Sequence, residues 1–316
     1  MPRAAPTTPS RSAQGPNWPR STPQPLPVPV RPLCSTCSGT VGARGLARLE
    51  APISAKPRRM HSDLDRLIDL TGRVAIVTGG SRGLGRAMAI GLAKAGASVV
   101  VASRKVDACQ EVVDEIVALG RRATAIPVRM QEHEDIEALV ATTVSRLGRL
   151  DIVVNNAATV LDRSLEAMTP EAFTGAFSTN LLGPLLLTKA AAPHLAEHGV
   201  GAILNISSIA AVRATPTRYL YPAVKSALLQ HTRSLAAHLA PQSIRVNAIM
   251  PGTFRTDMVE KAYTEDQLAE TAGHTPLGRV AEPTELVGPA LFLVSDMSSY
   301  VTGAVLTVDG GQTLIA

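Results

Sequence analysis

Tyr221 and Lys225 stand four residues apart, and Ser208 precedes the tyrosine by thirteen residues. Four residues correspond to about one helical turn, so a phenol and an ammonium group at this spacing project from the same face of a helix. A tyrosine with its ordinary pKa of about 10 is a poor base at neutral pH, but a neighbouring cation stabilises the phenolate. The three residues therefore predict a site in which a tyrosine exchanges a proton with a substrate oxygen that a serine hydroxyl binds.

A glycine-rich loop at residues 78–85 has the sequence Thr-Gly-Gly-Ser-Arg-Gly-Leu-Gly. It lies between the apolar run 74–77, which has the length and β-branched content of a buried strand, and a helical pattern. Gly79 and Gly83 can adopt backbone angles that other residues avoid, and Gly85 would let the helix approach the sheet closely. Because helix N-terminal amides attract phosphate, the loop predicts a pyrophosphate site, with an ordinary strand-to-helix turn as the alternative.

The residues after the second expected strand favour one dinucleotide over the other. An NAD-binding unit usually places a carboxylate there for the ribose hydroxyls, whereas this chain has Ser103, Arg104 and Lys105. The forked donors and the charge of Arg104 suit a 2′-phosphate, and Arg82 in the glycine loop would supply a second positive group. We therefore predict NADP(H) in preference to NAD(H); the alternative is a pair of solvated surface arginines.

Short β-branched runs alternate with helical patterns between residue 74 and the C-terminus. Nearly all-apolar strands that alternate with helices indicate a parallel sheet with helices on both faces, and ligands of such sheets bind at the carboxyl ends of the strands. We expect strands at 74–77, 98–102, 123–128, 152–155, 202–206, 244–249 and 305–308, and helices at 86–95, 106–119, 136–147, 170–197, 223–239 and 283–293.

The expected fold class is α/β: a single doubly wound (Rossmann) domain with a mainly parallel seven-stranded sheet, over residues 61–316. Residues 251–279 form the longest irregular stretch of this domain, and we expect them to be a substrate-side flap. The flap carries apolar side chains such as Phe254 and Met258 among charged ones. This mixture suits a modest ketone or secondary alcohol without choosing one.

Residues 1–60 differ in composition from the rest of the chain. They contain nine Lys and Arg residues against the single acid Glu50, whereas the remaining residues contain 22 basic and 25 acidic side chains. The segment is rich in Pro, Ser, Thr and Arg and has no apolar periodicity, so we expect a disordered leader. We favour an upstream sequence attached by a misplaced start, with Met60 as the natural first residue. An organelle transit peptide and a flexible interaction tail are the alternatives, and the Pro-rich run at 23–32 suits a targeting helix badly.

Cysteine, charge and hydropathy patterns disfavour several kinds of site. Cys34 and Cys37 form a lone C-x-x-C without a second ligand pair, and Cys109 lies on an expected helix, so we predict neither a metal site nor a disulfide framework. No basic stripe with interleaved aromatic residues follows the leader, which argues against nucleic-acid binding. The apolar run at 181–187 contains glycine and proline and is too short for a membrane span. We expect a cytoplasmic protein.

Several motifs together resemble the short-chain dehydrogenase/reductase family in their order and spacing. They are residues 78–85, the Asn-Asn-Ala-Ala run at 155–158, Ser208, Tyr221 with Lys225, Pro251-Gly252 and the closing Val-Asp-Gly-Gly at 308–311. The likeness extends from about residue 70 to residue 311, and a joint match in order is a far stronger signal than any single motif. It implies a Rossmann fold and an oxidoreductase that uses a nicotinamide dinucleotide.

The resemblance implies roles for four catalytic residues. Tyr221 would be the general acid/base, and Lys225 would hold the nicotinamide ribose hydroxyls and lower the pKa of the tyrosine. Ser208 would orient and polarise the substrate carbonyl. Asn180, in the Ser-Thr-Asn-Leu-Leu-Gly run at 178–183, matches the family's active-site asparagine, which positions a water in a proton relay to the lysine.

The resemblance also implies a cofactor site. Pro251 and Gly252 would line the nicotinamide side, and Thr256 would contact the phosphate or carboxamide region. The full cofactor-binding set implied for the dinucleotide is Gly79, Ser81, Arg82, Gly83, Leu84, Gly85, Ser103, Arg104, Asn156, Ala157, Tyr221, Lys225, Pro251, Gly252, Thr253 and Thr256.

Two positions depart from the family's pattern. Ala158 stands where glycine is usual at the end of the asparagine motif. Residues 129–132, Arg-Met-Gln-Glu, replace the aspartate that many members offer to the adenine amino group. Gln131 would substitute through its side-chain carbonyl, or backbone contacts alone would serve the adenine.

The expected reaction is hydride transfer between NADP(H) and a small ketone or secondary alcohol of the sugar-acid, polyol or 3-oxoacyl type. Two other classes stay open: a lyase or epimerase that retains its cofactor, and a non-catalytic NADP(H)-binding sensor. The tyrosine site favours the enzyme. Because family members are commonly tetramers or dimers, we expect a homotetramer or homodimer that pairs the helices at 170–197 and 223–239.

Overall fold

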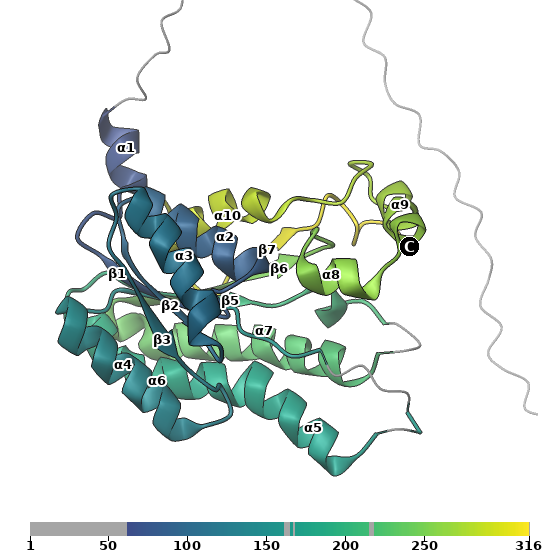
Figure 1. Ribbon diagram of the computed structural model, residues 1–316, viewed down its shortest axis with the longest axis horizontal. Coiled ribbons are helices and arrows are strands. Elements are labelled where there is room, and N and C mark those ends of the chain that lie inside the picture. The colour runs from purple at the N-terminus through teal and green to yellow at the C-terminus, as the bar shows by residue number, and fades with distance from the viewer. Residues whose placement is uncertain (1–61, 161–164, 167, 215–217, 316) are drawn as a thin grey trace, which may run out of the picture. The chain divides into compact units, whose positions relative to one another are not determined.

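The structure is a computed structural model that describes residues 62–160, 165–166, 168–214 and 218–315 (Figure 1). The predicted leader at residues 1–60 lies outside these ranges. From residue 74 onward, strands and helices alternate along the chain as the periodicity predicts.

Seven parallel strands form one sheet in the order β3-β2-β1-β4-β5-β6-β7. All seven predicted strands are present, and the prediction of a doubly wound Rossmann sheet is confirmed. β4 and β5 are completely buried, which explains why such strands read as continuous apolar runs. The strands are β1 (Val74–Thr78), β2 (Ser98–Ser103), β3 (Ala123–Pro127), β4 (Ile152–Asn155), β5 (Gly201–Ile206), β6 (Ile244–Pro251) and β7 (Val305–Val308).

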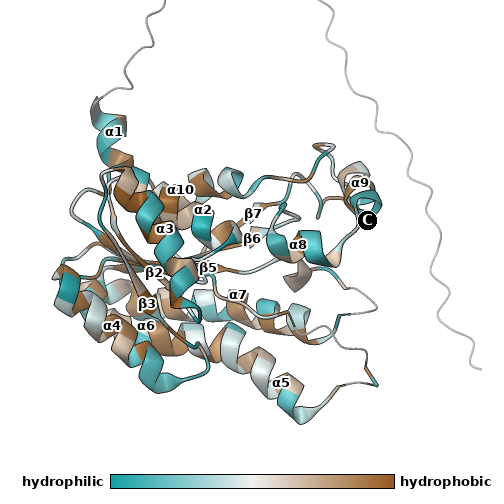
Figure 2. Ribbon diagram, in the orientation of Figure 1, coloured by the Kyte–Doolittle hydropathy of each residue, from teal (hydrophilic) through white to brown (hydrophobic). Residues whose placement is uncertain are grey.

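Helices cover both faces of the sheet (Figure 1). One face packs on α2 (Gly83–Lys94), α3 (Val106–Ala118) and α10 (Val287–Val294), and the other packs on α4 (His133–Leu147), α6 (Gly183–Ala196) and α7 (Leu220–Leu239). Figure 2 shows the strands as predominantly hydrophobic and the helices as mixed, which is the pattern of amphipathic helices on a buried sheet. The separate apolar core on each face holds the carboxyl ends of the strands in a fixed arrangement.

The helical stretch predicted at 170–197 is helical from residue 170 to residue 196, but it is not one regular α-helix. The structure has α5 (Pro170–Phe177), a π-helical turn at Ser178–Leu182 and then α6. Pro184 supplies the physical reason, because it has no N–H for the carbonyl four residues earlier and its ring crowds that carbonyl. The residue four positions before Pro184 is Asn180, so the interruption falls on a predicted catalytic residue.

The flap predicted as irregular at 251–279 contains two short helices, α8 (Asp257–Ala262) and α9 (Glu265–Gly273), and this part of the prediction is wrong. Thr256 caps α8, and Thr264 caps α9 in a capping box with Gln267. The sequence carried this signal, since a threonine followed three residues later by glutamine marks a helix start. A further short helix, α1 (Ser62–Ile68), precedes the first strand.

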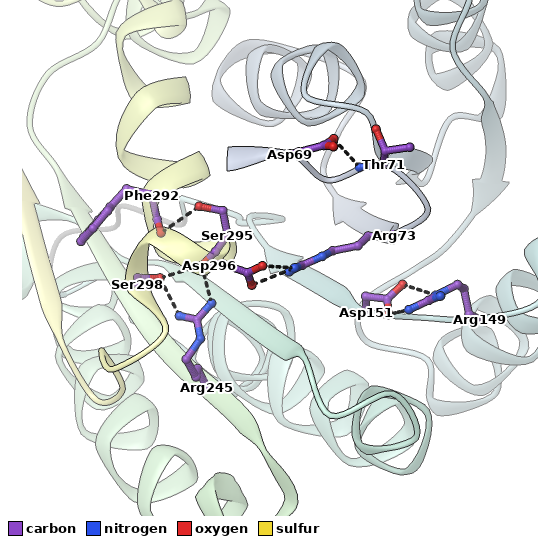
Figure 3. Close-up of polar contacts among 10 residues, drawn as sticks. All are labelled: Asp69, Thr71, Arg73, Arg149, Asp151, Arg245, Phe292, Ser295, Asp296 and Ser298. Atoms are coloured by element: carbon purple, nitrogen blue, oxygen red, sulfur yellow. Dashed lines mark hydrogen bonds and ion pairs between the residues drawn. The ribbon is translucent and has the colours of Figure 1, made fainter. Parts of the chain in front are cut away.

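Ion pairs join the segments at the amino ends of the strands, opposite the predicted site (Figure 3). Arg73 Nη2 contacts both carboxylate oxygens of Asp296 at 2.7 Å. Arg149 donates to the buried carboxylate of Asp151, which also accepts the backbone amide of Val74 at 2.8 Å. Arg245 at the start of β6 donates to a backbone carbonyl at the end of α10 and to backbone and hydroxyl oxygens of the segment that follows it. Charged side chains therefore fasten this end of the sheet, where the chain carries no predicted chemistry.

Candidate active site

The sheet order brings the predicted site residues to one edge. β1 lies between β2 and β4, so the connections on its two sides run in opposite directions and open a crevice at the carboxyl ends of these strands. The glycine loop follows β1, Ser103 ends β2, Asn156 follows β4 and Ser208 follows β5.

The glycines of the first loop lie against the loop after β4. A Cβ atom at Gly85 would lie 2.2 Å from the Gly79 carbonyl oxygen and 2.4 Å from Asn156 Nδ2, and one at Gly79 would lie 2.9 Å from Ala157 Cα. Gly79 and Gly83 have φ angles of 63° and 53°, in the left-handed region that favours glycine. The loop is therefore a tight backbone cradle, which fits the close approach of a pyrophosphate.

Thr78 joins the two loops through its buried hydroxyl group. Thr78 Oγ1 accepts the backbone amides of Asn156 and Ala157, each at 3.1 Å, and donates to the Val154 carbonyl at 3.2 Å. Asn156 Nδ2 in turn donates to the carbonyls of Thr78 at 2.9 Å and Gly79 at 3.2 Å. The side chain of Asn156, predicted to bind the cofactor, thus holds the glycine loop in shape.

The first turn of α2 borders this cradle. Arg82 occupies the N-cap position and makes no capping hydrogen bond through its side chain. A Cβ atom at Gly83 would lie 3.3 Å from Thr256 Cγ2, so Thr256 faces the glycine loop from the start of α8. Ser81 and Leu84 are half-buried in the same loop, and Leu84 packs against the core. The structure brings Thr256 and the glycine loop together, as a site that encloses phosphates requires.

Ser103 and Arg104 lie at the end of β2. Ser103 Oγ donates to the Lys105 carbonyl at 3.3 Å and lies 3.1 Å from Cys109 Sγ. Burial raises the pKa of the Cys109 thiol, which keeps this partner neutral. Arg104 and Arg82 are exposed on the adjacent loops after β2 and β1, and neither forms an ion pair within the described part of the chain. Both guanidinium groups are accessible to an anionic ligand.

Lys225 is 2 % exposed, and its Nζ donates to the Ile206 carbonyl at the end of β5 over 2.7 Å. Desolvation lowers the pKa of this lysine to about 8, so the ammonium form still predominates at pH 7. Nζ lies 5.6 Å from the centroid of the Tyr221 ring, within cation–π range. Ser207 Oγ also donates to the Lys225 carbonyl at 3.0 Å. The structure therefore brings Tyr221 and Lys225 together and fixes α7 to the end of β5.

Ser208 follows β5 by two residues and caps a short 3-10 helix at Ile209–Ala211. Its Oγ accepts the Ala210 backbone amide at 3.1 Å, which leaves the hydroxyl proton for a further acceptor. The 3-10 helix packs against α7, which carries Tyr221 near its start. Ser208 and Tyr221 are both half-buried. This placement suits two groups that meet the same substrate oxygen.

Asn180 is 1 % exposed in the middle of the π turn. Its Oδ1 accepts the Thr159 amide at 3.1 Å, and its Nδ2 donates to the carbonyls of Thr159 at 3.0 Å and Ala176 at 2.8 Å. The side chain thus fastens the segment after β4 to the turn, while its own carbonyl has no donor at Pro184. The turn also packs on the first residues of α7, since Leu181 contacts a cluster that includes Val224.

The segment after β6 contains the predicted nicotinamide-side residues. Pro251 ends the strand, and a Cβ atom at Gly252 would lie 2.7 Å from Asp309 Cβ. The Thr253 amide donates to Gln312 Oε1 at 3.1 Å, and Gln312 Nε2 donates to Thr253 Oγ1 at 3.2 Å. Sequence reasoning missed Gln312, and its only signal was its place directly after the closing Val-Asp-Gly-Gly motif.

Two arginines on the loop between Ser208 and Tyr221 contact other elements. Arg213 Nη1 donates to the Gln312 carbonyl at 3.1 Å, and Arg218 Nη2 lies 3.4 Å from the Tyr263 hydroxyl in the flap. The loop between the predicted serine and tyrosine is therefore tied both to the C-terminal turn and to the flap.

Among the residues that the structure describes, no three His, Cys, Asp or Glu side chains gather closely enough to hold a metal ion. In the same ranges, no helix combines the length and the apolar character that crossing a membrane requires. The groups offered to a cofactor are instead a backbone cradle, exposed guanidinium groups and a buried amine. These groups suit a dinucleotide.

A doubly wound parallel sheet, a glycine cradle at the point where its order reverses and a Tyr-Lys pair at the end of β5 define the class of dinucleotide-dependent oxidoreductases. A family model described as enoyl-(acyl carrier protein) reductase matches residues 79–313. The chain belongs to the short-chain dehydrogenase/reductase family, whose members act on CH–OH and C=O groups.

Individual relatives agree with this membership over nearly their whole length. The chain is 36 % identical to a 3-oxoacyl-[acyl-carrier-protein] reductase of Synechocystis sp. over 78 % of this chain and 98 % of the relative. A solved gluconate 5-dehydrogenase from Burkholderia cenocepacia, in complex with NADP and tartrate, has a TM-score of 0.76 and 32 % identity over 80 % of this chain and 100 % of that one. A solved 7α-hydroxysteroid dehydrogenase, complexed with NADH and 7-oxo glycochenodeoxycholic acid, has a TM-score of 0.76 and 36 % identity over 78 % and 96 %.

Proposed function

We propose that the protein transfers a hydride between NADP(H) and a small ketone or secondary alcohol, with Tyr221 as the general acid/base. The observation that carries this proposal is the buried Lys225 amine, 5.6 Å from the Tyr221 ring and bonded to the end of β5. Burying an ammonium group is unfavourable in free energy. Its place beside Tyr221 is explained if the cation stabilises the phenolate form of the tyrosine. A non-catalytic NADP(H) sensor could use the amine to bind the cofactor, but it would not need the phenol of Tyr221 beside it.

Four residues of the site have distinct roles in the proposed proton transfer. Tyr221 donates its phenolic proton to the substrate oxygen in reduction and takes it back in oxidation. Ser208 donates its free hydroxyl proton to the same oxygen and so orients the carbonyl. Lys225 favours the phenolate, and the main-chain carbonyl of Asn180 holds a water that returns protons to the lysine. When bound, the nicotinamide supplies the hydride in reduction and accepts it in oxidation.

The substrate class is a carbonyl or alcohol of the 3-oxoacyl, sugar-acid or polyol type. The names of the relatives include a 3-oxoacyl reductase, a gluconate dehydrogenase and a hydroxysteroid dehydrogenase. The activity assay should therefore test a panel of carbonyl and alcohol substrates that covers all three chemistries. We expect NADPH-dependent reduction of at least one ketone, measured as loss of NADPH fluorescence with the alcohol product identified by mass. A product isomerised or dehydrated without net NADPH consumption would instead support the alternative lyase or epimerase.

The cofactor preference provides a separate prediction. In a paired titration, NADPH is expected to bind about tenfold or more tightly than NADH, because even one charge-assisted bond from Arg82 or Arg104 to a 2′-phosphate contributes about 1.5–3 kcal/mol. Arg104→Asp should reverse the preference, since the carboxylate accepts the ribose hydroxyls and repels the phosphate.

Arg121→Asp, which changes another exposed arginine, is the matched control and should leave the ratio of the two affinities unchanged. Tighter NADH binding by the wild-type protein would overturn the assignment of both arginines. The homotetramer or homodimer stays a prediction of the resemblance, and the cytoplasmic location stays a prediction from the sequence pattern.

A further inference from the structure

The loop after β3 contacts the π turn at both of its ends. Gln131 Nε2 donates to Thr179 Oγ1 at 3.0 Å and reaches the Gly175 carbonyl at 3.4 Å. One residue earlier, Met130 packs against the end of the turn, because a Cβ atom at Gly183 would lie 2.5 Å from the Met130 carbonyl oxygen. The segment that departs from the family's pattern is thus in direct contact with the element that carries Asn180.

A π turn needs such support because its backbone leaves the regular α-helical bonding pattern. Two side-chain amides donate to consecutive carbonyls at the end of α5, just before the π turn: Asn180 Nδ2 to Ala176 at 2.8 Å and Gln131 Nε2 to Gly175 at 3.4 Å. A carbonyl can only accept, so the Gly175 contact fixes the Gln131 amide with its NH₂ group toward the turn. One donor comes from within the turn and the other from a loop 44 residues earlier in the chain.

We propose that Gln131 is a positioning residue for the catalytic asparagine. Through Thr179 and Gly175 it holds the turn in the arrangement that lets Asn180 serve the proton relay to Lys225. Gln131 lies four residues after the end of β3, the strand next to β2, on the side of the site where we expect the adenosine. Gln131 therefore connects the loop that we expect to contact adenine with Asn180, which we expect to serve the proton relay. This inference rests on the proposed function, and in particular on the relay through Asn180.

The test compares two variants that lose the donors in different ways. Gln131→Leu removes the amide, and Gln131→Glu keeps its shape but can no longer donate. In both, kcat is expected to fall about threefold to tenfold, the effect of one lost hydrogen bond, while KM for the ketone stays unchanged and Kd for NADPH changes less than kcat. The solvent deuterium isotope effect on kcat should rise, because proton transfer limits the rate more strongly when the relay is misplaced.

A double-mutant cycle locates the effect in the turn. Thr179→Val removes the closer acceptor. The double variant with Gln131→Leu should lower kcat no more than the larger of the two single changes, because both changes remove the same hydrogen bond. Gln110→Leu is the matched control, since the amide of this exposed glutamine donates to Asp114 within its own helix at 2.8 Å. It should leave kcat and the isotope effect as they are.

The outcomes separate this inference from the function on which it rests. Full kcat in Gln131→Glu, additive losses in the cycle, or equal losses of kcat and NADPH affinity with a lowered melting temperature would each overturn the positioning role. A wild-type protein without turnover on any substrate would overturn the proposed function and this inference with it. An active wild-type protein with unaffected Gln131 variants would overturn the role of Gln131 alone.

Discussion

Tyr221→Phe is expected to lower kcat by about 10²–10⁴-fold, the contribution of a positioned general acid/base, while Kd for NADPH changes little. The variant keeps the ring that lies beside the Lys225 ammonium group and removes only the hydroxyl. Hydride transfer to a carbonyl then lacks the proton that must reach the oxygen as the C–H bond forms. Single-turnover kinetics with NADPH, together with a fluorescence titration of cofactor binding, measure the two quantities separately.

Tyr219→Phe is the matched control, because this tyrosine is two residues away and 41 % exposed. It should retain most of the wild-type kcat. Unchanged turnover in Tyr221→Phe would falsify the assigned role, and equal losses in both variants would indicate a general disturbance of the start of α7.

Gly85→Ala is expected to weaken NADPH binding about 5-fold to 150-fold, because overpacking at such a site costs about 1–3 kcal/mol. The added methyl group would meet the Gly79 carbonyl oxygen at 2.2 Å and Asn156 Nδ2 at 2.4 Å. The first atom belongs to the backbone, and Asn156 Nδ2 is bonded to the carbonyls of Thr78 and Gly79. Neither group can move without deforming the cradle. Isothermal titration with NADPH gives the affinity, and thermal unfolding reports any loss of stability.

Gly288→Ala provides the control for this substitution. Gly288 lies in α10, and a Cβ atom there would meet nothing within 4 Å. Alanine favours a helix over glycine, so this variant should bind NADPH normally and be slightly more stable. Normal cofactor binding by Gly85→Ala would show that the glycine loop does not form the predicted cradle.

The sequence predicted the sheet well because fully buried parallel strands leave a strong local signal. Each of the seven strands is a short apolar run, and the three completely buried ones, β1, β4 and β5, are among the clearest. The division of the helix at 170–197 was also accessible, since Pro184 cannot donate to the Asn180 carbonyl.

The contacts between the site residues were harder to predict from the sequence than the strands were. Residue types and spacing suggested Tyr221 and Lys225 because the two belong to one helical turn. Gln312 and Thr253 are 59 residues apart and meet only because β6 and β7 pair side by side. Similarly, the buried hydroxyl of Thr78 reaches amides 78 and 79 residues further on. No local pattern reports such partners, which depend on the register of neighbouring strands.

The ion pairs drawn in Figure 3 have a consequence for how this scaffold can acquire new specificities. Arg73 and Asp296 connect the start of the first strand with the segment after the last long helix, and Arg245 fastens the sixth strand to the same segment. The loops that border the substrate emerge from the other end of the sheet. Mutations that remodel those loops therefore leave these anchoring bonds in place, and selection or engineering can exchange substrates while the framework keeps its stability.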